Sequence, residues 1–265
     1  MLNIVVAHDL EARLPIQWLG LQQVNSDPRI YSDGKGIRLV VAGQGRQCAA
    51  AAVNYLGQSN RSKTSAAWLN FGIAGHQSLA LGQSLVPDRI EEAASRETYY
   101  PAPVFPATNR GLLVTVDEPE FSYPEVAAYD MEGSAFWQAA SKQSTLELVQ
   151  CLKVVSDNRE HSHELLNKGR ILEIIESARE DFLGLAEAML ALLSQLPNPV
   201  PFLEQQIELQ ESVHLSSTQK IQLERSLQRL HALDLGEELE EIVKNRHTDS
   251  RALISQLEAA LNGKR

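Results

Sequence analysis

Up to residue 196, short apolar runs alternate with stretches of helical periodicity, and this alternation leaves few folds open to the chain. We expect strands at residues 2–7, 37–43, 66–75, 83–90, 111–117 and 152–157, and helices at residues 46–58, 133–143 and 163–193. Strands that alternate with helices build a largely parallel or mixed sheet whose two faces are both covered. The pattern therefore predicts an α/β domain over residues 1–196.

A proline-rich segment, residues 197–202, separates this domain from the rest of the chain. Proline lacks a backbone donor and breaks helices, so the segment is expected to be a boundary. Residues 203–265 show helical periodicity only, with an apolar phase that shifts near Leu233. A helix pair of this size has little core of its own. We therefore expect a helical extension that packs as a hairpin on the α/β domain or on a partner subunit, in preference to a separate protein.

Charge and cysteine content argue against several classes of protein. The net charge is −10, whereas nucleic-acid binders usually present a basic face. The cysteines, Cys48 and Cys151, lack metal-ligand spacing, and no run of 18 apolar residues is present. The first residues lack the basic region of a signal peptide. The sequence predicts a cytoplasmic protein without a metal, nucleic-acid or membrane partner.

Acidic residues and glycines gather at the expected ends of the strands. In open α/β sheets, ligands bind beyond the carboxyl ends of the strands, and glycines allow them to approach the backbone. The first strand is followed by a loop that carries Asp9 or Glu11. The other candidates are residues 43–47, residues 72–76, Glu132 and Asp157. Together they predict a ligand site at one edge of the sheet.

Simpler interpretations compete with a functional one at several of these positions. Asp130 suits a cap on the helix that starts near Gly133, because a carboxylate there meets unpaired N–H groups. The segment "GQGRQC" matches the dinucleotide-binding pattern in part, but Cys48 replaces its third glycine. His161 and His163 are expected to be loop residues that face solvent. We therefore expect no nicotinamide cofactor.

Five segments within residues 1–195 carry a more specific pattern: "IVVAHDLEARLP", "VVAGQGRQCAAAAVNYL", "LNFGIAGHQSLALGQSLVP", "YDMEGSAF" and "LKVVSDN". In this order they resemble the nucleoside phosphorylase/nucleosidase superfamily, most closely its methylthioadenosine/adenosylhomocysteine nucleosidase branch. The resemblance implies a three-layer phosphorylase-like fold with a central mixed, mostly parallel sheet. Residues 203–265 have no counterpart in this family pattern, so they would form an all-helical C-terminal extension.

The resemblance implies cleavage of the N-glycosidic bond of a purine nucleoside. Asp157 would protonate or hydrogen-bond N7 of the base, with Ser156 orienting its carboxyl group. Such an acid needs a carboxyl kept protonated by partial burial. Glu11 matches the family's water-activating glutamate, which implies hydrolysis of a methylthioadenosine- or adenosylhomocysteine-like substrate. No cofactor is implied.

The binding residues follow from the same resemblance. Glu132 would accept hydrogen bonds from the ribose 2′- and 3′-hydroxyls, a task that suits an ionised carboxylate. Met131 would pack on the sugar or base, and the glycine-rich loop would contact the substrate at Ile73 and Gly75. The aromatic residues left to stack on a base are Phe105, Phe121 and Tyr123.

Two alternatives remain open from the sequence. A phosphorylase would use inorganic phosphate as co-substrate and bind it through cations, here Arg13, Arg46 and Lys153, although Glu11 would repel it. The second alternative is a relative that binds nucleosides or acts as a scaffold without turnover. It is suggested by residues 91–126, which are fewer than in the family's usual insertion. Members of this family commonly form dimers or hexamers. We therefore expect a homo-oligomer, and a dimer before any larger assembly.

Overall fold

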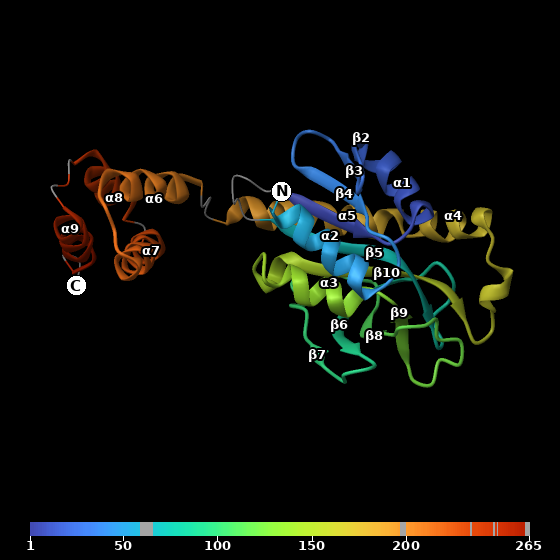
Figure 1. Cartoon of the computed structure of the whole chain (residues 1–265). Coiled ribbons are helices and arrows are strands. Elements are labelled where there is room, and N and C mark those ends of the chain that lie inside the picture. Colours follow the sequence, from blue (N-terminus) through green and yellow to red (C-terminus); the bar gives the residue numbers. More distant parts are fainter. Residues whose placement is uncertain (59–65, 197–199, 234, 246, 248, 263–265) are drawn as a thin grey trace. The chain divides into compact units, whose positions relative to one another are not determined.

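The computed structural model describes residues 1–58, 66–196, 200–233, 235–245, 247 and 249–262. These residues form two compact units, one ending at Leu196 and the other starting at Val200 (Figure 1). Within the described ranges, no helix has the length and apolar character needed to cross a membrane.

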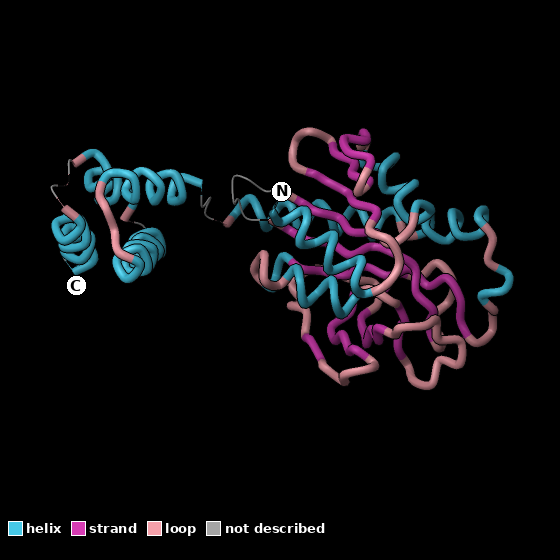
Figure 2. Tube along the Cα trace, viewed as in Figure 1, coloured by secondary structure: helices cyan, strands magenta, loops and turns pink. Residues whose placement is uncertain are grey.

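A mixed sheet forms the centre of the first unit (Figure 2). Its strands are β1 (Leu2–Val6), β2 (Gln22–Ser26), β3 (Arg29–Ser32), β4 (Ile37–Val41), β5 (Ala67–His76), β6 (Ser84–Glu92), β7 (Thr98–Tyr99), β8 (Arg110–Thr115), β9 (Ala127–Asp130) and β10 (Val149–Asn158). Their order is β10-β6-β8-β9-β5-β1-β4-β3-β2, with β7 on β6. Because β10 also pairs with β5, the strands β5, β10, β6, β8 and β9 close into a ring.

The central strands run parallel and are buried. β1 pairs in parallel with β4 and β5, and β5 pairs in parallel with β10. Every residue of β1 and β10 is buried. The sequence of β1 is mostly apolar, as is usual for a buried strand, whereas β10 also buries polar side chains such as Lys153 and Asp157. The carboxyl ends of β1, β5 and β10 therefore lie at one edge of the sheet.

Helices cover both faces of the sheet. The helices of this unit are α1 (Asp9–Leu19), α2 (Arg46–Gln58), α3 (Gly133–Ala140), α4 (Lys168–Ser177) and α5 (Arg179–Gln195), with short 3₁₀ turns at Leu146–Leu148 and His163–Leu165. Apolar residues of α1, α4 and α5 share a core with one face of the sheet, and those of α2 and α3 share a second core with the other face. These cores give the three layers that the sequence predicts.

The helix expected over residues 163–193 is instead divided at Ala178, between α4 and α5. The hydroxyl of Ser177 lies 2.7 Å from the carbonyl oxygen of Ile174 and 3.0 Å from that of Gly82, so it provides one donor at the end of α4. Glu180 and Asp181 then lie in the first turn of α5, where acidic groups stabilise a helix start.

The second unit is built from α6 (Val200–Ser212), α7 (Ser217–Ala232), α8 (Gly236–Lys244) and α9 (Ser250–Asn262). The chain turns between α7 and α8, where the apolar phase shifts at Leu233. Leucines from all these helices form one core: Leu209, Leu223, Leu227, Leu230, Leu239, Leu253 and Leu257. The expected two-helix hairpin is therefore wrong, because this part of the chain has enough helices to bury its own apolar residues.

Candidate functional site

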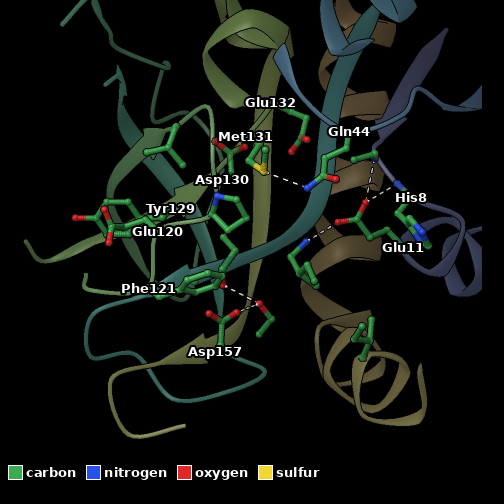
Figure 3. A pocket seen from close by; sticks show the side chains of 18 of the residues that line it. His8, Glu11, Gln44, Glu120, Phe121, Tyr129, Asp130, Met131, Glu132 and Asp157 are labelled. Carbon is green, nitrogen blue, oxygen red and sulfur yellow. Dashed lines mark hydrogen bonds between the residues drawn. The ribbon is translucent and has the colours of Figure 1, made fainter. Parts of the chain in front are cut away.

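A cavity of about 420 Å³ opens at the carboxyl ends of β1, β5 and β10 (Figure 3). Its lining includes most of the residues that the sequence motifs single out: Glu11, Ile73, Gly75, Met131, Glu132, Ser156 and Asp157. Two further acidic residues, Glu120 and Asp130, also border it. With Gln44, which also lines the cavity, the structure brings together residues from all five motifs, and their roles in a reaction stay predictions.

Glu11 lies in the first turn of α1, so the loop expected for it is wrong. A capping box starts this helix: His8 Nδ1 accepts from the N–H of Leu10, and Glu11 Oε2 accepts from the N–H of His8 at 2.9 Å. Glu11 Oε2 also accepts from Ala7, and Oε1 accepts from the N–H of Ile73 at 2.9 Å. Backbone donors of β5 and of the turn after β1 therefore fix this carboxylate.

Gly72 on β5 leaves room for the Glu11 carboxylate in this position. A Cβ atom on Gly72 would lie 2.6 Å from Glu11 Oε1, closer than any such contact allows. A side chain at Gly72 would therefore displace the Glu11 carboxylate from the N–H of Ile73. The "FGIAG" segment thus supports Glu11 as well as lining the cavity.

Glu132 lies at the turn from β9 into α3 and is buried. Its Oε1 accepts from the N–H of Gly45 at 2.7 Å, and Gly45 has a φ of +96°, which favours glycine. Burial raises the pKa of Glu132 to about 7, with Asp130 and Glu11 adding to the rise while Lys153 opposes it. Glu132 is therefore a carboxyl group whose charge changes near neutral pH.

Met131 lies beside Glu132 at the same turn and faces the cavity (Figure 3). The amide of Gln44 donates to its sulfur at 3.1 Å. Gln44 itself lines the cavity and precedes Gly45 in the "GQGRQ" turn. This turn therefore contacts both residues that the sequence analysis assigns to ribose and base.

Asp130 has a structural role beneath the cavity. Its Oδ2 accepts from the N–H of Gly133 at 2.8 Å, so its predicted cap on α3 is confirmed. Its Oδ1 accepts from the hydroxyl of Thr115 at 2.7 Å, and Lys153 Nζ lies 2.8 Å from Oδ2. Lys153 is buried and, although burial opposes this, Asp130 and Glu132 raise its pKa. The Lys153 ammonium group therefore forms an ion pair with Asp130 and does not face the cavity.

Asp157 is buried at the end of β10, where the pairing with β5 shifts register between Val155 and Asp157. Such an irregularity changes the direction of a side chain. The hydroxyl of Ser156 donates to Asp157 Oδ1, as the sequence analysis expects of a residue that orients this carboxyl. The hydroxyl of Tyr123 donates to Asp157 Oδ2. Sequence reasoning missed this second donor and named Tyr123 only for stacking.

The other two aromatic candidates, Phe121 and Phe105, lie in different parts of the α/β unit. Phe121 lines the cavity and stacks on His163, with ring centroids 3.6 Å apart. Phe105 is buried in the core with α5 and does not line this cavity. Of the three aromatic candidates, only Phe121 is therefore placed to stack on a ligand.

The cations proposed for phosphate are not brought together. Arg46 pairs with Glu92 and with Asp117, whose Oδ1 lies 2.6 Å away, and it thereby joins α2 to the segment after β8. Lys153 pairs with Asp130, and Arg13 is exposed on α1. Among the described residues that line the cavity, none is lysine or arginine.

Comparisons with known proteins identify the fold. No family model matches the chain, and no curated protein matches it. The 5′-methylthioadenosine/S-adenosylhomocysteine nucleosidase from S. pneumoniae, solved with a transition-state inhibitor, is 22% identical with a TM-score of 0.54, covering 69% of this chain and 96% of that one. S-adenosylhomocysteine nucleosidase from Streptococcus pyogenes is 21% identical with a TM-score of 0.53, over 74% and 97% of the two chains.

Futalosine hydrolase from Helicobacter pylori is similar in the same way. It is 12% identical with a TM-score of 0.58, over 71% of this chain and 97% of that one. Nucleosidases of different substrates thus share the fold of this chain. The three-layer phosphorylase-like fold predicted from the sequence is confirmed.

Proposed function

We propose that this protein hydrolyses the N-glycosidic bond of a purine nucleoside, with a methylthioadenosine- or adenosylhomocysteine-like compound as substrate. The observation that carries the proposal is the meeting of Glu11, Glu132 and Asp157 around one cavity. Each of the three carboxyl groups is fixed by hydrogen bonds from a different part of the chain. The nucleosidases that share the fold support the same reaction class.

Each carboxyl group has one task in this reaction. Glu132 accepts hydrogen bonds from the ribose hydroxyls and places C1′ in the cavity. Asp157 gives its proton to N7, so the electrons of the breaking C1′–N9 bond pass to a neutral base. Glu11 takes a proton from the water that forms the new bond at C1′. The sugar is released with a hydroxyl at C1′ and the base with its added proton.

The charge of the cavity favours water over phosphate as the nucleophile. Four carboxyl groups line the cavity, those of Glu11, Glu120, Glu132 and Asp157, whereas the Asp130 side chain is 0% exposed and paired with Lys153 beneath it. The described part of its lining contains no lysine or arginine to offset them. Inorganic phosphate is an anion, and binding it needs cations or N–H groups that point at it. The same argument favours an uncharged nucleoside over a nucleotide as substrate.

The test is base release from purified protein. Methylthioadenosine, adenosylhomocysteine, adenosine and inosine are each incubated with and without inorganic phosphate, and the free base is quantified. Release without phosphate supports the proposal, and release that requires phosphate assigns a phosphorylase. Binding of a nucleoside without release by the wild-type protein would instead assign a binding protein.

A Glu11→Gln variant sharpens this test. It keeps a side chain of the same shape but cannot accept the proton of water, so hydrolysis should fall at least about a hundredfold. Glu187→Gln is the matched control, because Glu187 lies on α5 and does not line the cavity. Equal rates in wild type and Glu11→Gln would show that Glu11 is not the group that takes the proton from water.

A further inference from the structure

Tyr123 has a backbone conformation that needs support from other residues. It lies between β8 and β9 with a φ of +45°, in the left-handed region that non-glycine residues rarely adopt. Its carbonyl oxygen accepts from Gln77 Nε2 at 3.0 Å and from Arg159 Nη2 at 2.7 Å. Gln77 follows β5 and Arg159 follows β10, so side chains from two strand ends fix this one residue.

The phenol ring is fixed as firmly as the backbone. Tyr123 is 2% exposed, and its ring packs against Tyr129 with centroids 5.9 Å apart. A Cβ atom on Gly75 would lie 2.6 Å from the ring carbon Cε1 and 3.1 Å from Asp157 Oδ2. At position 75 of β5, only glycine therefore leaves room for the hydrogen bond between Tyr123 and Asp157.

The result is an Asp157 carboxyl group with a hydroxyl donor on each oxygen. Ser156 donates to Oδ1 and Tyr123 donates to Oδ2. Ser156 is the neighbour in sequence, whereas Tyr123 is 34 residues away along the chain. Burial, together with the nearby Asp157 carboxylate, raises the pKa of Tyr123, so its phenol remains a donor at neutral pH.

We propose that Tyr123 is a positioning residue for Asp157 in the hydrolysis proposed above, on which this inference rests. The phenol fixes the plane of the carboxyl group and leaves its remaining lone pairs to hold the proton that N7 receives. After that proton has moved to the base, the carboxylate accepts from both hydroxyls, which stabilises its charge. Tyr123 keeps its own proton throughout, so it does not act as an acid itself.

Tyr123→Phe tests this by removing the hydroxyl and keeping the ring. Since the variant loses a donor to the charged form of Asp157, the high-pH limb of kcat/KM should move to higher pH by about one unit. The rate kcat should fall about tenfold or more while KM changes little, because the ribose contacts are intact. A loss of packing alone would lower stability without moving the pH profile.

Tyr99→Phe is the matched control. Tyr99 also donates to a carboxylate, that of Glu97, at 2.6 Å, but it lies on β7 and does not line the cavity. This control should keep the wild-type pH profile. If Tyr123→Phe does not fold, 3-fluorotyrosine at position 123 keeps ring and hydroxyl and makes the phenol a stronger donor. The high-pH limb should then move to lower pH.

A second measurement separates this inference from the proposed function. In protein labelled with ¹³C at aspartate carboxyl groups, the Asp157 resonance is identified by its loss in Asp157→Asn. Its titration midpoint should lie at higher pH in Tyr123→Phe than in wild type, whether or not a nucleoside is cleaved. An unchanged midpoint overturns the role of Tyr123. A shifted midpoint in a protein that cleaves no nucleoside overturns the proposed function alone.

Discussion

Lys153 and Asp130 form an ion pair that is closed to solvent, with Nζ 2.8 Å from Oδ2 and side chains that are 2% and 0% exposed. This pair explains how the first of two carboxylates, that of Asp130, fits into the apolar segment from Ala127 to Ala140. Asp130 is satisfied from inside the protein, by Lys153, Thr115 and the start of α3. Glu132, two residues later, accepts only one hydrogen bond from the described residues and lines the cavity.

Lys153→Met should destabilise the α/β unit by about 3–5 kcal/mol, because it leaves the Asp130 carboxylate buried without its counter-charge. Thermal unfolding followed by circular dichroism measures the effect. The double variant Lys153→Met with Asp130→Asn removes both charges and should recover most of the loss. A single variant that melts with the wild type would show that the pair contributes nothing to folding.

Asp157→Asn should lower base release by about a hundredfold or more, because an amide keeps the shape of the side chain but cannot supply the proton. Asp88→Asn is the control for the same chemical change, since Asp88 is exposed on β6 and does not line the cavity. Steady-state rates on the best substrate decide the outcome. Wild-type turnover in Asp157→Asn would show that another group protonates the base.

The pKa of Glu132, raised by burial to about 7, predicts how substrate binding depends on pH. Below pH 7 this carboxyl group becomes protonated and loses its capacity to accept from two ribose hydroxyls. The kcat/KM value should therefore fall by about tenfold per pH unit on the acid side. Glu132→Gln should have a lower kcat/KM without this acid limb. An acid limb at the same pH in Glu132→Gln would assign it to another group.

The same pKa has a consequence for stability. The ordinary value of 4.5 applies to the unfolded chain, so between about pH 4.5 and pH 7 the folded protein binds the proton more tightly. The contribution of Glu132 to the free energy of unfolding therefore falls as pH rises through this window and stays low above it. Glu132→Gln should be more stable than wild type at pH 8, by about 1–3 kcal/mol, and no different at pH 4. Urea unfolding at both pH values measures this.

The site was predictable from the sequence where its residues follow strands. Glu11 follows β1 and Asp157 lies near the end of β10, and parallel pairing with β5 brings the carboxyl ends of these strands to one edge. Glu132 follows β9 and reaches the same edge through the antiparallel pairing of β9 with β5. The start of α1 at Asp9 was also readable, from His8 and Glu11 at capping-box spacing, although histidine is an uncommon cap.

The remaining features depend on contacts that no local pattern encodes. Tyr123 reaches Asp157 because β9 pairs with β5 and because Gly75 leaves room, and both facts belong to the tertiary structure. Arg46 looked available for phosphate, but Glu92 and Asp117 reach it from distant segments. The strands β2 and β3 have mostly exposed or half-buried residues, so they lack the apolar runs that reveal a strand.

The helical tail should fold separately from the α/β unit. Each apolar core of the described residues lies wholly on one side of the proline-rich segment, with the tail core formed by α6 to α9. A chain that ends at Leu196 should therefore keep its base release and its melting transition. In the full-length protein, Leu227→Ala should destabilise the tail by about 2–5 kcal/mol and leave base release unchanged.

Light scattering on the full-length and shortened proteins tests the oligomeric state at the same time. The homodimer predicted from the sequence should persist in the chain that ends at Leu196 if the α/β unit carries the interface. Dissociation into monomers would assign the interface to the tail. Aggregation of the shortened chain, or loss of its base release, would show that the α/β unit needs the tail to fold, against the separation of the two cores.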